Sequence, residues 1–172
     1  MRFVHLLCCG GTIEKMYLEQ TGSVANVEDK IDRYLDRLRL PATTVVTTRL
    51  MNKDSLDMTD ADRQMVVAAV NGKLEERVAP VVITHGTDTM VETGLRLNRE
   101  LGNILVPIIL TGAMTPLGFE NSDGLQNLTE SLFGAHVLPP GVWVVMHNQA
   151  FPIDRVRKDR LLARFVSTDA PL

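Results

Sequence analysis

Short runs of Val, Ile and Leu, separated by longer segments with helical spacing, constrain the fold of this chain more than any other feature of its sequence. The runs are continuous rather than alternating, which is typical of strands covered on both faces. We predict strands at residues 3–9, 43–50, 81–84, 106–110 and 142–146. The segments between them repeat apolar residues every three or four positions, which favours helices. We predict helices at residues 27–40, from a Thr59 cap to about residue 77, between Asp88 and Gly102, and at residues 122–137.

Alternating strands and helices predict an α/β fold with a doubly wound, mainly parallel sheet and helices on both of its faces. The length of 172 residues corresponds to about one domain, and we expect residues 1–172 to form a single one. Ligands of such a sheet bind beyond the carboxyl ends of its strands. Residues from His147 onwards show no clear period, and their structure is the least predictable.

Charge and composition exclude several classes of function. The net charge of -3 lacks the basic character of a nucleic-acid-binding domain, and no apolar run approaches the roughly 18 residues of a membrane span. Cys8 and Cys9 are neighbours on a predicted strand, so their side chains point to opposite faces and a disulfide between them is geometrically unfavourable. Two reduced thiols favour a cytoplasmic protein. No spacing of possible ligands indicates a metal site, and we expect no cofactor.

Two polar motifs follow predicted strands. Gly10, Gly11 and Thr12 come directly after the first strand, where a glycine pair makes a tight turn and brings backbone N–H groups beside a ligand. The threonine hydroxyl is a candidate nucleophile, although a turn with a capping threonine has the same pattern. The glycines that a dinucleotide-binding turn needs further along are missing, which excludes that interpretation.

The second motif, residues 84–89, has the sequence Thr-His-Gly-Thr-Asp-Thr. Asp88 alone is explained as a helix cap, but three hydroxyls, an imidazole and a carboxylate are more than a cap requires. A threonine needs a base to become nucleophilic, and an ordinary carboxylate is too weak a base at neutral pH. A lysine beside Thr87 and Asp88 can fill that role in a dry site. We expect His85 to be structural rather than a base.

Together these motifs resemble the two signature sites of the bacterial-type L-asparaginase family. Weaker matches follow in the same order along the chain, and they resemble the cytoplasmic subgroup more than the periplasmic one. The weaker matches are Asp54-Ser55-Leu56-Asp57-Met58, Gly112-Ala113-Met114, and Ser122-Asp123-Gly124 with Asn127. The resemblance implies the flavodoxin-like fold of the family's N-terminal domain, and hydrolysis of L-asparagine to L-aspartate and ammonia. It covers residues 2–158, and we expect the family's C-terminal domain to be absent.

The resemblance also implies roles for individual residues. Thr12 attacks the side-chain amide and forms a β-aspartyl ester, while the Gly10–Thr12 turn and Thr87 hold the oxyanion. Thr87 and Asp88 form a second triad with a lysine, and gap-free spacing from Met146 places that lysine at Lys158. The residues implied in substrate binding are Gly11, Ser55, Leu56, Gly86, Asp88 and Ala113.

Lys158 stands among Arg155, Arg157, Arg160 and Arg164, which we interpret as a solvated charged face. Residues 14–26 have the polar, glycine-containing character of a lid. Tyr17 is the candidate for the family's lid tyrosine, although it comes earlier than the family spacing places it and is equally compatible with ordinary packing.

Two departures from the family pattern affect substrate contacts rather than the nucleophile. Leu56 stands where many members carry a polar group, and the family's second domain supplies part of the pocket wall. We therefore expect weakened substrate binding and self-association into a homo-oligomer. Two alternatives are less favoured. A catalytically inactive amino-acid-binding module of the same fold is disfavoured because Thr12, Thr87, Asp88 and Lys158 are all present. An amidotransferase component that delivers ammonia to a partner is disfavoured because we expect such proteins to carry extra domains.

Overall fold

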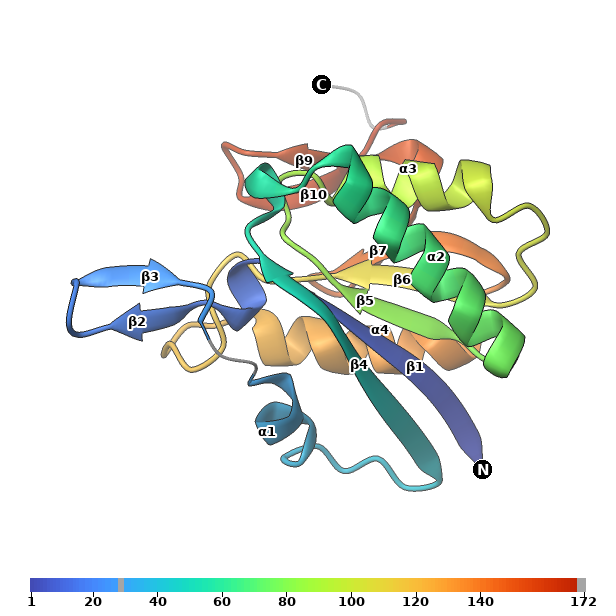
Figure 1. Ribbon diagram of the computed structural model, residues 1–172, viewed down its shortest axis with the longest axis horizontal. Helices are drawn as coiled ribbons and strands as arrows, with labels where there is room; N and C mark the ends of the chain where they lie inside the picture. Colours follow the sequence, from blue (N-terminus) through green and yellow to red (C-terminus); the bar gives the residue numbers. More distant parts are fainter. Residues whose placement is uncertain (28–29, 170–172) are drawn as a thin grey trace.

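The computed structural model describes residues 1–27 and 30–169 and contains a six-stranded sheet in the order β4-β1-β5-β6-β7-β8 (Figure 1). The strands are β1 (Arg2–Gly10), β4 (Thr43–Lys53), β5 (Val81–Thr84), β6 (Pro107–Thr111), β7 (Gly141–Met146) and β8 (Gln149–Pro152). The first five pair in parallel and β8 is antiparallel to β7, which confirms the predicted mainly parallel α/β fold. All five predicted strands are present.

The parallel strands follow the flavodoxin-like order, in which the direction of winding reverses between β1 and β5. The chain passes from β1 outwards to β4, and then returns across β1 to build β5, β6 and β7. Loops leave this switch point in opposite directions and open a crevice at the carboxyl ends of the strands. Both polar motifs of the sequence leave the sheet there.

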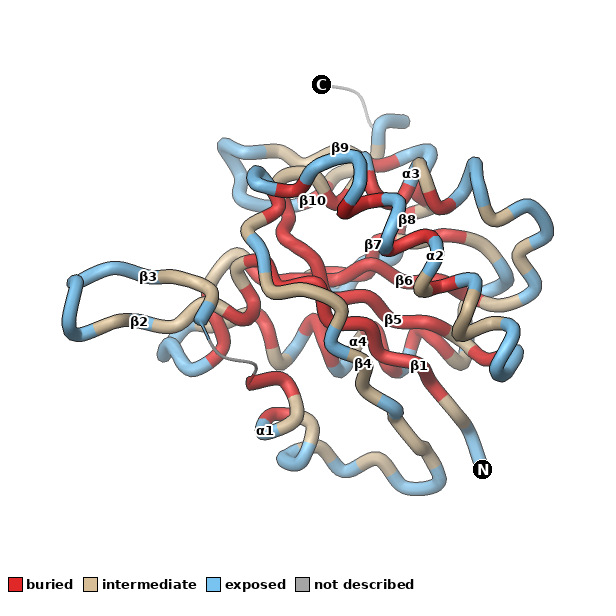
Figure 2. Tube along the Cα trace, in the orientation of Figure 1, coloured by how far each residue is buried: buried red, intermediate tan, exposed pale blue. Residues whose placement is uncertain are grey.

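Helices cover both faces of the sheet (Figures 1 and 2). On one face α2 (Asp60–Glu76) and α3 (Met90–Glu100) pack over a core that includes Leu7 and Cys9. On the other face α1 (Ile31–Leu35) and α4 (Gly124–Val137) pack over a core that includes Leu6 and Cys8. The adjacent cysteines thus lie in different cores, and both are free thiols. No helix of the described residues is long and apolar enough to cross a membrane.

The first predicted helix, residues 27–40, is wrong in extent. Residues 28–29 lie outside the described part, and α1 is helical only over Ile31–Leu35. After it, Arg37 N–H bonds to the Tyr34 carbonyl and Leu38 N–H to the Leu35 carbonyl, three residues back. These tighter bonds end the α-helix and lead towards the Pro41 turn.

Helix boundaries elsewhere follow side-chain capping. Thr59 caps α2 as predicted, in a reciprocal pair with Asp62. Helix α4 begins at Gly124 rather than at Ser122, because the side chains of Ser122 and Asp123 bond back to the turn after β6.

Two small hairpins were not predicted, because strands of three or four residues are too short to show a period. Strands β2 (Met16–Leu18) and β3 (Ser23–Ala25) form a hairpin that projects from the body, at the left of Figure 1, within the predicted lid. Strands β9 (Val156–Asp159) and β10 (Arg164–Ser167) form the second hairpin, from the segment without a clear period.

Candidate active site

The turns after β1 and β5 touch each other at the switch point of the sheet. Gly10 and Gly11 have φ values of 87° and 80°, and the Gly11 N–H bonds to the Lys53 carbonyl on β4 at 2.7 Å. A Cβ on Gly11 would lie 2.3 Å from the backbone nitrogen of Gly86. The glycine pair is therefore needed both for its conformation and for this close approach, which places Thr12, the next residue, beside the second motif.

Ser55 completes the contact from the other side. It begins the short 3₁₀ turn η2 (Ser55–Asp57) after β4, and a Cβ on Gly86 would lie 2.4 Å from its hydroxyl oxygen. Ser55 is only 1% exposed, yet its hydroxyl makes no hydrogen bond within the described residues. Because a buried hydroxyl without a partner is costly, this group is available for a ligand. The neighbouring Leu56 is 64% exposed and offers only apolar contact.

Lys158 joins the second motif, as the spacing predicted. From β9, its Nζ donates to Thr87 Oγ1 at 2.7 Å and to Asp88 Oδ1 at 3.1 Å. Thr87 is 4% exposed, and its hydroxyl also faces the Met114 sulfur at 3.7 Å. The three side chains come from two segments about 70 residues apart, and the 2.7 Å between Lys158 Nζ and Thr87 Oγ1 is short enough for proton transfer between the two groups.

Arg160 is exposed, as the interpretation of the basic cluster as a solvated face predicted, but it also contacts the second motif. Its Nη2 lies 3.1 Å from Asp88 Oδ1, the same oxygen that Lys158 contacts. The side chain remains 70% exposed. Arg160 follows β9 directly, so the strand that delivers Lys158 also brings this guanidinium over Asp88.

We predicted that His85 is a structural residue rather than a base, and its contacts are those of a structural residue. It is fully buried, its Nδ1 faces the Gly86 carbonyl at 2.8 Å, and its Nε2 faces Thr93 Oγ1 at 2.9 Å. Burial lowers the pKa of the imidazole to about 4, outweighing the bond to Gly86, so the ring is neutral at physiological pH. It fixes the second motif against α3.

The turn after β6 forms another wall, and Asp123 holds it. The carboxylate accepts hydrogen bonds from the backbone N–H groups of Met114 and Thr115, from Asn127, and contacts His147 Nε2 at 2.7 Å. Burial alone would raise the pKa of Asp123, but these bonds outweigh it and hold the pKa below its usual value. His147 carried no signal in the sequence, because its role depends on a partner from another element.

The same turn packs closely on the second motif. A Cβ on Gly112 would lie 2.4 Å from the His85 carbonyl oxygen, and Ala113 is fully buried. The predicted substrate-binding glycines and Ala113 therefore serve first as small residues that let three turns meet. Among the described residues, no group of three or more His, Cys, Asp or Glu side chains is arranged to hold a metal ion.

A family model described as "Asparaginase, N-terminal" matches residues 3–166 of this chain.

The chain belongs to the asparaginase family.

Among its relatives, the L-asparaginase of Thermococcus kodakarensis is 31% identical over 153 residues, covering 89% of this chain and 46% of the relative. Its solved structure matches with a TM-score of 0.84 over 98% of this chain and 52% of the other. L-asparaginase 1 of Escherichia coli is 31% identical over 90% of this chain and 47% of its own length. One component of the glutamyl-tRNA(Gln) amidotransferase of Methanococcus vannielii is 30% identical, over 87% of this chain and 35% of its own length. The chain thus spans about half the length of these relatives, or less.

Tyr17, the candidate lid tyrosine, lies on β2 and is 56% exposed. An ideal Cβ on Gly22 would lie 4.0 Å from its hydroxyl, so the side chain leans towards the turn of the projecting hairpin. The role of Tyr17 therefore stays a prediction that requires the hairpin to close over Thr12.

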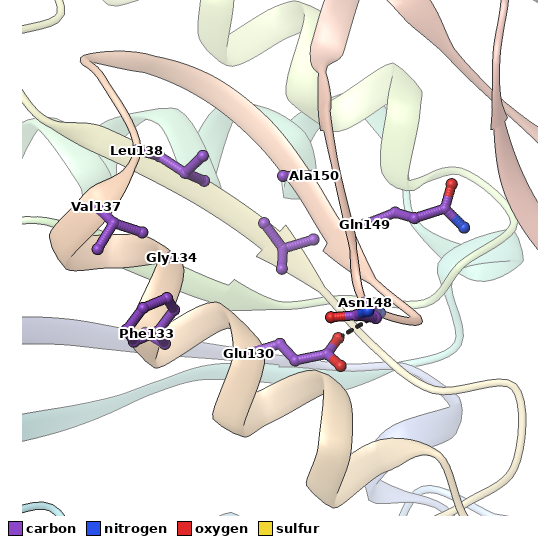
Figure 3. A pocket seen from close by; sticks show the side chains of 9 residues that line it. Glu130, Phe133, Gly134, Val137, Leu138, Asn148, Gln149 and Ala150 are labelled. Carbon is purple, nitrogen blue, oxygen red and sulfur yellow. Dashed lines mark hydrogen bonds between the residues drawn. The ribbon is translucent and has the colours of Figure 1, made fainter.

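An apolar groove lies away from the site, between α4 and β8 (Figure 3). Its volume is about 210 Å³, and the Asn148 N–H bonds to Glu130 at its mouth. Phe133 and Val137 stand at its rim and are 65% and 56% exposed. It holds none of the predicted catalytic residues.

Proposed function

We propose that this chain hydrolyses L-asparagine to L-aspartate and ammonia, with Thr12 as nucleophile. The observation that carries the proposal is the contact of Lys158 with both Thr87 and Asp88, beside the turn that presents Thr12. This scheme uses neither the neutral imidazole of His85 nor a metal ion as the base. The base is assembled from the lysine and the threonine.

In the first step the Thr12 hydroxyl oxygen attacks the side-chain amide carbon. Its proton is transferred to the leaving nitrogen, ammonia departs, and a β-aspartyl ester remains on Thr12. Negative charge on the amide oxygen is held by the backbone N–H groups of the Gly10–Thr12 turn and by Thr87. In the second step Lys158 and Thr87 take a proton from a water molecule, whose oxygen attacks the ester carbon. The proton passes to the Thr12 oxygen as the ester C–O bond breaks, which releases L-aspartate and restores the Thr12 hydroxyl.

Substrate recognition is assigned to Ser55 and Asp88. The unpartnered Ser55 hydroxyl is placed to donate to the α-carboxylate, and the Asp88 carboxylate faces the α-ammonium. These groups fix the distance from the substrate's amino-acid end to Thr12, so glutamine, longer by one methylene, is the poorer substrate. We propose that the described domain carries these groups by itself. The exposed Leu56 adds no polar contact, so the KM for asparagine lies near or above the upper end of the usual range of about 1 μM to 1 mM.

The experiment is ammonia release from L-asparagine by the purified chain, with a hydroxylamine trap for the ester. Thr12→Ala should abolish both ammonia and β-aspartyl hydroxamate, and Thr87→Val should reduce turnover by at least about 10²-fold, as loss of an oxyanion donor does. Thr129→Val is the matched control, because its exposed hydroxyl bonds only within α4. Wild-type turnover in Thr12→Ala would exclude the threonine nucleophile.

The relationship to the amidotransferase component favours a second candidate, in which the chain delivers ammonia within an assembly. Such a chain would release little ammonia from free asparagine until its partner is added. An inactive amino-acid-binding module would bind asparagine in calorimetry and release none under either condition. The cytoplasmic location and the homo-oligomeric state remain predictions.

A further inference from the structure

The two turns that would hold the ends of the substrate are joined by polar contacts. Thr12 begins the 3₁₀ turn η1 (Thr12–Glu14) after β1, and Ser55 begins η2 after β4. Under the proposed function Thr12 attacks the amide and Ser55 holds the α-carboxylate. The separation of the two turns therefore sets the length of the substrate that fits between them.

An ion pair makes the first side-chain link between these turns. Lys15 follows η1 directly, and its Nζ donates to Asp54 Oδ2, one residue before Ser55. The two side chains are 22% and 29% exposed, so solvent and salt screen the pair less than they screen a pair on the open surface. The link thus joins the residue after one turn to the residue before the other.

Asp54 also organises η2. Its second oxygen, Oδ1, accepts the Leu56 N–H at 3.0 Å and caps the turn. Burial alone would raise the pKa of Asp54, but the bonds from Lys15 and Leu56 outweigh it and hold the pKa below its usual value. The carboxylate is therefore ionised at neutral pH and holds both turns at once.

Asn26 makes a second link, which does not depend on charge. From just after β3, its Nδ2 donates to the Gly11 carbonyl at 2.9 Å and to Asn52 Oδ1 at 2.8 Å. Gly11 precedes Thr12, and Asn52 lies on β4, the strand that leads to η2. The backbone bond from Gly11 to Lys53 is a third link between the same two parts of the chain.

Open space lies beside these links. A cleft of about 570 Å³ opens there, and its lining includes Lys15, Asn26, Asn52 and Asp54. On the inner side Gly86 packs closely on Gly11 and on Ser55. On the cleft side the two turns have room to move apart, and the polar links oppose that movement.

We propose that Lys15 and Asp54 are specificity-determining positioning residues, whose link sets the site to the length of asparagine and excludes glutamine, longer by one methylene. The inference rests on the proposed hydrolysis of L-asparagine and deepens it. Without the link η1 and η2 relax towards the cleft, so the longer amide reaches Thr12 and the shorter one loses contact at one end. Neither residue takes part in the chemistry itself.

The test is the kcat/KM for L-glutamine divided by that for L-asparagine, both measured by ammonia release. A difference of one methylene is worth about 10- to 200-fold in discrimination, so loss of the link should raise this ratio by about tenfold. Asp54→Asn keeps an oxygen for the Leu56 N–H and removes the charge that holds Lys15. Lys15→Met removes the other partner, and each variant should raise the ratio.

Lys53→Met is the matched control. Lys53 lines the same cleft, but its Nζ pairs with Asp62 at 2.8 Å, so its loss removes the same charge and leaves the link intact. The ratio should stay at the wild-type value. A loss of stability alone lowers the active fraction for both amides equally, so the ratio separates positioning from a purely structural role.

A double variant tests whether the two residues act through each other. Asp54→Asn combined with Lys15→Met should raise the ratio no further than either single change does. Shifts that multiply in the double variant, an unchanged ratio in either single variant, or an equal shift in Lys53→Met overturn the inference while asparagine hydrolysis stands. Failure of the wild type to release ammonia from either amide overturns the proposed function as well.

Discussion

Replacing Gly11 with alanine should separate the two turns that build the active site. Gly11 has φ 80° and ψ -175°, a region open almost only to glycine, and occupying it costs another residue about 1–3 kcal/mol. The added Cβ would also lie 2.3–2.6 Å from backbone atoms of His85 and Gly86. That is about 1 Å short of ordinary van der Waals contact, and overpacking of this kind costs about 1–3 kcal/mol.

Together these terms predict a loss of roughly 2–6 kcal/mol in unfolding free energy, and a melting temperature lower by roughly 5–20 °C. Any folded fraction should lose about 10²-fold or more in kcat/KM, because a 1 Å displacement of the Thr12 turn disturbs the attack geometry. Thermal unfolding and ammonia release measure the two effects. Gly72→Ala is the matched control: apart from its chain neighbours and the nearby backbone of its own helix, no atom lies within 4 Å of its added Cβ, and its place inside α2 predicts a gain of about 0.5–1 kcal/mol. Near-wild-type activity and melting of Gly11→Ala would refute the close-contact argument.

Three further predictions concern the base, the pH dependence and the assembly. Lys158→Met should abolish turnover measured as ammonia release while Arg157→Met retains it, and equal effects would contradict the role of Lys158. Since burial lowers the pKa of His85 to about 4, the unfolded state binds its proton first as the pH falls, so the contribution of His85 to the unfolding free energy should be constant above pH 6.5 and fall by about 3 kcal/mol between pH 6.5 and 4. Urea unfolding measures that slope, and His85→Gln should lack it. Sedimentation should give a mass above the 19.1 kDa of one chain, and Phe133→Asp should lower it; a wild-type mass of 19.1 kDa would rule out self-association.

The sequence predicts the sheet well because its strands are short, continuous apolar runs. Runs of this kind are typical of strands that are buried on both faces. The contacts of Lys158 followed from family spacing, and the structure brings the lysine to Thr87 and Asp88. Arg160 and His147 were missed for a physical reason. Each is a polar residue whose partner lies on another element, and no local pattern distinguishes such a residue from a solvated one.

The order of the catalytic parts along the chain has a consequence for synthesis. Thr12 follows the first strand, whereas Lys158 lies on β9, close to the end of the described chain. At a translation rate of about 5–20 residues per second, the nucleophile emerges roughly 7–30 s before its base. A nascent chain on the ribosome therefore holds an incomplete site until β9 has emerged. Under the proposed mechanism, activity should appear only when the β9–β10 hairpin docks, so catalysis itself would report that this hairpin has folded into place.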